Sequence, residues 1–178
     1  MCLIKKRNLT LSVISAALLA TSWGAQAAQD TAKLTITANV VENTCTLDTT
    51  APAVDFKIIS MRDVKSVNTE LKTMPFTLKL SACQGGATGV TVTATGSANK
   101  AISDLFETNG TATGVGIKIM GGDSGTTKLT PVGSTAKYKI KSSAATADLK
   151  FTASLVQSDA KVTAGNVSST INLNVSYD

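Results

Sequence analysis

Cysteine has the most reactive side chain in this chain of 178 residues, which contains three: Cys2, Cys45 and Cys83. Cys45 and Cys83 lie far apart, and neither belongs to the Cys-x-x-Cys pattern typical of zinc and redox sites. In an oxidising compartment, two cysteines of a small domain most simply form a disulfide; two free thiols in a core are the alternative. Closing the loop between them is expected to stabilise the domain by about 3–4 kcal/mol.

The sequence contains no histidine, which excludes catalytic triads, zinc sites and general bases that depend on an imidazole. It also lacks a phosphate-binding loop, a nucleophile elbow and an EF-hand loop, and the glycines between residues 114 and 122 indicate turns and bulges. Folding could bring the carboxylates of Asp104, Glu107 and Asp123 together, but surface solvation explains these residues more simply. We therefore expect a protein that is not an enzyme and that has no metal or cofactor.

The first 27 residues have the three parts of a secretory signal peptide. A basic start at residues 5–7 precedes a short apolar run at 9–19 and small residues at 25–27. Because a membrane helix needs roughly 18 apolar residues, a retained membrane anchor is the less favoured reading. Cleavage after residue 27 removes Cys2 and lowers the formal net charge from +5 to +2, with no basic stripe left for a nucleic acid. We expect export, with neither a nucleic-acid partner nor stable membrane insertion.

Apolar and polar residues alternate along the rest of the chain, with the period of a half-buried β-strand. Threonine and valine dominate the alternating runs, and short turn clusters rich in glycine, serine and asparagine, among them residues 131–134, separate them. The runs cover residues 34–38, 76–80, 90–94, 116–119, 138–140, 149–153 and 171–177. This pattern predicts one all-β antiparallel sandwich, with at most a short helical turn near residues 101–106.

The last alternating run brings core-type side chains to the end of the chain. Ile171, Leu173, Val175 and Tyr177 are spaced by two, and only Asp178 follows them. Terminal residues usually fray. We therefore expect so apolar a terminal strand to be packed, either within its own fold or against a partner.

Three segments and this ending resemble the subunits of fimbriae that are assembled by the bacterial chaperone–usher pathway, of the type 1 pilin kind. The segments are VVENTCTL at residues 40–47, FTLKLSAC at 76–83 and NGTATGVGI at 109–117. The ending places Gly165 fourteenth from the C-terminus, the family's spacing, and a tyrosine in the penultimate position. The resemblance covers essentially the whole sequence after the signal peptide.

The resemblance implies an incomplete immunoglobulin-like β-sandwich that lacks its last strand, with a pilin domain at residues 42–178. Such a domain exposes an apolar groove that a strand from another chain can fill. It also implies a structural subunit of a surface fimbria that supports cell adhesion, is exported through the periplasm and polymerises by donor-strand exchange. Its partners would be neighbouring fimbrial subunits, a periplasmic pilus chaperone and an outer-membrane usher.

The N-terminal extension, residues 28–41, is the donor strand that the resemblance implies. It would insert into the groove of the next subunit instead of folding onto its own domain. Its donor face would consist of the alternating residues Ala32, Leu34, Ile36, Ala38 and Val40. Without the resemblance, the same alternation would be the first strand of a closed sandwich, and that reading stays open.

The C-terminal strand would border the groove and pair with the chaperone before assembly. The residues implied in this role are Gly165, Ile171, Leu173, Val175, Tyr177 and Asp178. The terminal carboxylate of Asp178 would meet basic residues of the chaperone in a charge-assisted contact.

Three other functions compete with a fimbrial subunit. A tip adhesin would need a receptor-binding domain, for which residues 28–178 leave no room. A free-standing periplasmic or secreted β-sandwich binding module would have a closed fold and would purify as a monomer without a chaperone. A hydrolase on a β-sandwich has no residue set that the sequence can name.

Overall fold

The computed structural model of the protein describes residues 45–49, 52–83, 87–141 and 145–178. These residues belong to one of the two units into which the chain divides, Asn39–Asp178. The predicted signal peptide and the predicted donor strand at 28–41, with Ala32, Leu34, Ile36, Ala38 and Val40, lie outside the described residues and stay predictions. None of the described residues forms a helix that is both long enough and apolar enough to cross a membrane.

The described chain consists almost entirely of short strands. In chain order the elements are β1 (Thr46–Leu47), the 3-10 helix η1 (Met61–Asp63), β2 (Glu70–Ser81), β3 (Gly89–Thr95), β4 (Asn109–Gly110), β5 (Val115–Gly121), β6 (Thr127–Leu129), β7 (Val132–Lys139), β8 (Ala147–Gln157), β9 (Val167–Ser168) and β10 (Asn172–Tyr177). The predicted runs after residue 75 all overlap strands, namely β2, β3, β5, β7, β8 and β10, but β2 and β7 begin at Glu70 and Val132, well before the predicted starts at residues 76 and 138.

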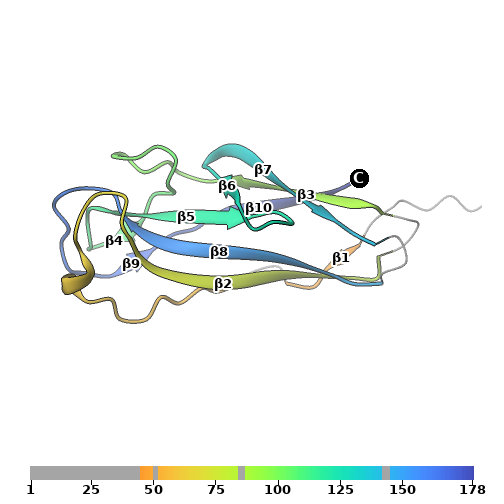
Figure 1. The fold of residues 1–178 in the computed structure, drawn as a ribbon, viewed down its shortest axis with the longest axis horizontal. Helices are drawn as coiled ribbons and strands as arrows, with labels where there is room; N and C mark the ends of the chain where they lie inside the picture. Colours follow the sequence, from red (N-terminus) through yellow and green to blue (C-terminus); the bar gives the residue numbers. More distant parts are fainter. Residues whose placement is uncertain (1–44, 50–51, 84–86, 142–144) are drawn as a thin grey trace, which may run out of the picture. The chain divides into compact units, whose positions relative to one another are not determined.

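The strands form two main antiparallel sheets that pack face to face (Figure 1). One sheet has the order β1-β2-β8-β5-β6 and the other the order β10-β3-β7, while β4 and β9 form a small separate pair. The ring of Tyr138 on β7 meets the edge of Phe151 on β8, with 5.3 Å between the ring centres, so side chains of the two sheets interlock. The predicted all-β sandwich is confirmed.

The core is built from every second residue of the strands, whose side chains face inward. On β3, for example, Val90, Val92 and Ala94 are fully buried, whereas Thr91 and Thr93 between them are half-buried. On β8, Leu149, Phe151, Ala153 and Leu155 face the same core. The alternation read from the sequence is therefore the burial pattern of the sheets.

Two local features differ from the expectation. Residues 131–134 were expected to form a turn, but the chain passes at Pro131 from β6 in one sheet to β7 in the other. Pro131 has no N–H to offer to a ladder, so it suits this change of sheet. Near residues 101–106 there is a turn but no helix; the Asn99 side chain accepts hydrogen bonds from the N–H groups of Ala101 and Ile102, both at 3.1 Å.

Candidate functional site

The predicted disulfide joins Cys45 to Cys83, with 4.0 Å between the two Cα atoms. Next to it, β1 pairs with the end of β2 through Thr46 and Ser81. The start of the described domain is thus tied covalently and by backbone pairing to the end of β2.

One edge of β10 has no strand beside it among the described residues. β10 pairs with β3 over its whole length, in the register Asn172 to Thr95 and Tyr177 to Val90. The Asp178 N–H donates to the Gly89 carbonyl at 3.0 Å. Because hydrogen-bonded positions alternate in an antiparallel ladder, the N–H groups of Leu173, Val175 and Tyr177 point to the open edge.

The apolar side chains of β10 are only half covered. Leu173, Val175 and Tyr177 are half-buried, while Asn172, Asn174 and Ser176 between them are exposed. The Tyr177 ring lies partly out of water, and this burial raises the pKa of its hydroxyl. The apolar face predicted for the C-terminal strand is present. It packs against the edge of the core, but part of each side chain stays exposed.

Residues 52–60 run without strand structure and form the other wall of the site. Val54, Phe56 and Ile59 are half-buried against the core, yet residues 52–59 make no backbone–backbone hydrogen bond to any other described residue. A segment with anchored side chains and free backbone groups resembles a strand whose neighbour is missing.

Between this wall and β10 lies an apolar groove made of two adjoining hollows. The narrower hollow encloses about 180 Å³, and its lining includes Phe56, Phe76, Ile119, Ile171 and Leu173. The wider hollow encloses about 590 Å³. A cavity of roughly 150 Å³ takes one benzene molecule, so the groove has room for several aliphatic side chains. Its floor is the inward face of the larger sheet.

Gly165 lies at the rim of the wider hollow, where two loops meet closely. A Cβ atom built on Gly165 would come within 2.6 Å of the carbonyl carbon of Thr111. The loops are held together by the N–H groups of Thr111 and Ala112, which donate to the Asn166 carbonyl at 3.1 and 3.2 Å. Glycine is needed here because backbone approaches backbone.

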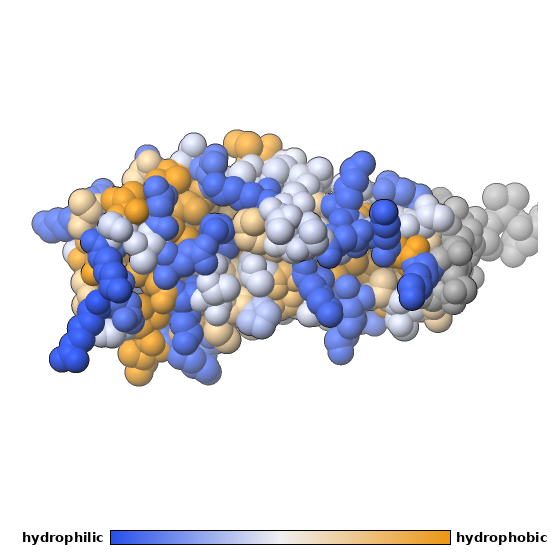
Figure 2. All heavy atoms as spheres, in the orientation of Figure 1, coloured by the Kyte–Doolittle hydropathy of each residue, from blue (hydrophilic) through white to orange (hydrophobic). Residues whose placement is uncertain are grey.

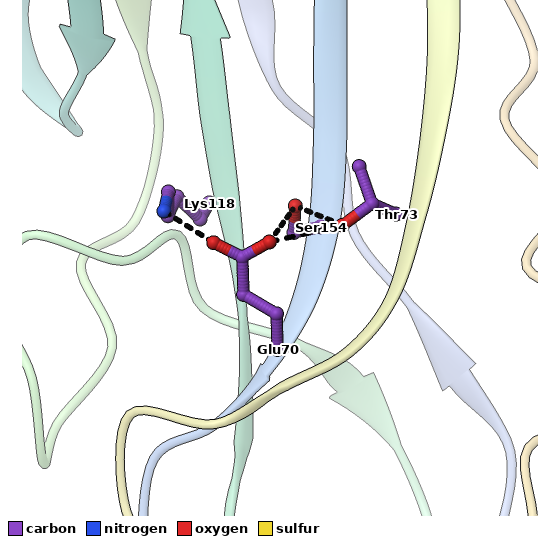
Figure 3. Close-up of polar contacts among 4 residues, drawn as sticks. All are labelled: Glu70, Thr73, Lys118 and Ser154. Carbon is purple, nitrogen blue, oxygen red and sulfur yellow. Dashed lines mark hydrogen bonds and ion pairs between the residues drawn. The ribbon is translucent and has the colours of Figure 1, made fainter.

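The opposite face of the larger sheet carries a polar cluster that links its central strands (Figure 3). The Glu70 carboxylate pairs with the Lys118 ammonium and accepts hydrogen bonds from Thr73 and Ser154, both at 3.0 Å. The pKa of Glu70 is lowered, chiefly by its hydrogen bond to Lys118. The cluster joins β2, β8 and β5 behind the groove floor.

At the end of β10, backbone bonds hold Asp178 against β3. An oxygen of its terminal carboxylate accepts a hydrogen bond from the Thr88 N–H at 3.3 Å, and its side-chain carboxylate accepts one from the Thr91 hydroxyl at 3.3 Å. The residue is exposed, so solvent reaches it at the end of β10.

The structure brings most of the predicted groove residues to one site. Ile171 and Leu173 line the narrower hollow and Gly165 the wider one, while Val175 and Tyr177 continue the same face of β10. The wall at residues 52–60 was not predicted. The only signal for it was the pair Val54 and Phe56 at strand spacing, and the adjacent Ile58 and Ile59 interrupt that spacing.

The part of the chain that the structure describes contains no group of three or more Cys, Asp or Glu residues that could hold a metal ion.

The sequence matches a family model described as fimbrial protein over residues 32–178. Among solved structures, a subunit of a chaperone–usher pilus from a study of rod uncoiling is similar, with 24% identity, a TM-score of 0.64, and coverage of 86% of this chain and 99% of that chain. PapA, the rod subunit of the P pilus, has 25% identity, a TM-score of 0.60, and coverage of 82% and 99%.

The CupB6 tip adhesin of Pseudomonas aeruginosa has 20% identity and a TM-score of 0.54, and the match covers 66% of this chain and 33% of the adhesin. No curated protein sequence gives a significant match. The solved structures confirm the open, immunoglobulin-like all-β fold that the sequence predicted.

Proposed function

The chain belongs to the fimbrial protein family and is a structural subunit of a pilus; we propose that its groove receives residues 28–41 of a neighbouring subunit. In this exchange each copy donates its N-terminal segment to one neighbour and accepts the segment of another. The observation that carries the proposal is the pair of unpaired edges, β10 and residues 52–59, on either side of an apolar floor.

An inserted strand would complete the smaller sheet. It would lie between β10 and residues 52–59 and would accept hydrogen bonds from the outward N–H groups of Leu173, Val175 and Tyr177. Strand addition of this kind draws its affinity from backbone hydrogen bonds and its register from side chains that enter pockets. An antiparallel direction fits the rest of the sheet and gives the stronger ladder.

The segment proposed to enter has the pattern that the groove requires. Every second residue from 32 to 40 is apolar, so one face of an extended strand would meet the floor while threonine, lysine and asparagine face solvent. Ala38 is a small residue in a central position and suits the tightest part of the groove. The alignment of residues 32–40 along the groove is part of this proposal.

Before assembly, the same groove would be held by a periplasmic chaperone, which would then deliver the subunit to an outer-membrane usher. An unfilled apolar groove beside an open sheet edge would otherwise promote aggregation. The carboxylates of Asp178, an exposed residue at the end of β10, offer charge-assisted contacts to basic residues of such a chaperone. Export would depend on cleavage of residues 1–27, and the mature chain would reach the bacterial surface within the fimbria.

The test compares the exported chain with a truncation that lacks residues 28–40. The proposal expects the truncation to bind a fimbrial chaperone and a synthetic peptide of residues 28–41 but to form no polymer. Size-exclusion chromatography with and without the peptide distinguishes these states. Normal polymer formation by the truncation would refute the donor role. A stable monomer of the whole chain that needs no chaperone and binds no peptide would instead indicate a closed binding module.

A further inference from the structure

Three exposed hydrophobic side chains gather at the wider hollow of the groove. Ile58 is 97% exposed, Met61 48% and Val167 37%, and all three line this hollow. Single exposed hydrophobic residues are common on soluble proteins, but a cluster at the mouth of a groove indicates contact with another molecule. In Figure 2, hydrophobic residues reach the surface near the end of the domain at which η1 and β4 lie in Figure 1.

The local backbone turns Ile58 outward. Lys57 has a φ of 58°, which is uncommon for a residue other than glycine. The Asp55 carboxylate holds this conformation, because it accepts the Lys57 N–H at 2.8 Å and pairs with the Lys57 ammonium at 2.8 Å. The kink breaks the alternation, so that Phe56 and Ile59 both face the core and Ile58 faces solvent.

The direction of the donor strand determines whether the folded domain of the donor subunit lies near the three exposed hydrophobic side chains. An antiparallel donor starts beside Tyr177 and ends beside Asn172, at the narrower hollow, which adjoins the wider one. If residue 40 occupies that end, only residues 41–44 separate it from Cys45, which is bonded to Cys83 in the donor's own domain. Because an extended residue spans at most about 3.6 Å, that domain begins within about 18 Å of the groove's exit.

We propose that Ile58, Met61 and Val167, here called the exit patch, form a docking surface for the folded domain of the copy that supplies the donor strand. The inference rests on the proposed function, because it requires a second copy of this chain in the groove. It adds a contact between folded domains to the strand exchange. Burial of Ile58 there would remove from water the most exposed large hydrophobic side chain of the described residues.

The experiment measures the contribution of the donor strand separately from that of the folded domain that follows it. The exported chain carrying Ile58→Ser and Met61→Ser is compared with the unaltered chain in two assemblies: with a synthetic peptide of residues 28–41, and as a polymer with itself. The peptide has no folded domain, so its dissociation rate from each chain measures what the two side chains contribute to holding the strand itself. The polymer of the variant should dissociate in denaturant about tenfold faster or more than the change in peptide dissociation alone accounts for.

Val132→Ser is the matched control, since Val132 is 86% exposed on β7 and does not line the groove. Its polymer should dissociate at the unaltered rate. Equal dissociation rates for the exit-patch variant and the unaltered chain would overturn the inference and leave strand exchange intact. An equal acceleration of peptide and polymer dissociation in the variant would also overturn it, because the residues would then act on the strand alone. Failure of the unaltered chain to bind the peptide would overturn the proposed function together with this inference.

Discussion

At the scale of single residues, Gly165 shows why a particular residue type is required. The position has no positive φ, so conformational freedom is not the reason; the reason is the backbone of residues 111 and 112 against it. A side chain here would separate the two loops that close the wider hollow.

Gly165→Val should lower the free energy of unfolding by about 1–3 kcal/mol, the usual cost of forcing extra atoms into a packed site. Denaturation of the peptide-bound chain in urea measures this change. Ala164→Val is the control, because Ala164 is exposed beside the same loop. Equal stability of the Gly165 variant and the control would show that the close backbone approach does not hold in solution.

Tyr177 and Ser176 are neighbours on opposite faces of β10, so the same substitution at each position tests the role of the groove face. Tyr177→Asp places a charge on the half-buried face, where it would be desolvated once a strand enters, so chaperone capture and periplasmic yield should fall severalfold. Ser176→Asp places the same charge on the exposed face and should leave both nearly unchanged. Periplasmic yield with a co-expressed fimbrial chaperone measures both. The account is wrong about this face if the two variants behave alike.

At the scale of elements, two sheet edges differ in how readily they accept a strand. Along most of its length β2 has only β8 as a partner among the described residues, but its centre contains Pro75 and its start contains a bulge between Glu70 and Lys72. Proline removes a donor and a bulge disturbs the ladder, so this edge is protected from pairing. β10 has neither feature, which directs strand addition to the groove.

The polar cluster around Glu70 links the strands behind the groove and should respond to pH. The pKa of Glu70 is lowered from 4.5 by its hydrogen bond to Lys118, so the folded state favours the ionised carboxylate. The resulting stabilisation is fully present above the unfolded pKa and is lost as pH falls through the lower folded pKa. Glu70→Gln removes it at every pH.

The difference in unfolding temperature between the unaltered chain and Glu70→Gln should therefore shrink as pH falls from about 6 to about 3. Thermal unfolding followed by circular dichroism measures it. Asp63→Asn, which changes an exposed acid on η1, should show no such convergence. A pH-independent difference for Glu70→Gln would mean that the ion pair does not stabilise the fold.

Much of the fold could be predicted, because strands with one buried face carry their period in the sequence. The runs that became β3, β8 and β10 and the Cys45–Cys83 disulfide were predicted correctly. The wall at residues 52–60 could not be predicted, since the left-handed Lys57 interrupts the strand period and its apolar side chains pack against core residues that are distant in sequence. The change of sheet at Pro131 was predicted as a simple turn, because the sheet that a strand joins depends on tertiary contacts that the local sequence does not show.

At the scale of the whole molecule, the described domain is a sandwich that is closed on one side only. The chain itself closes the side where β6 continues into β7, and the disulfide ties β1 to β2 at one end. The side between β10 and residues 52–59 has no strand among the described residues. A fold with such a gap can accept one strand from a neighbour, which suits the linear assembly proposed above.

Hydrogen exchange at β10, with and without a peptide of residues 28–41, tests the central claim most directly. The N–H groups of Leu173, Val175 and Tyr177 point to the open edge, whereas those of Asn172, Asn174 and Ser176 already face β3. The account predicts that the peptide slows exchange strongly at residues 173, 175 and 177 and much less at 172, 174 and 176. Unchanged exchange at the first three, with the peptide bound, would contradict strand insertion beside β10.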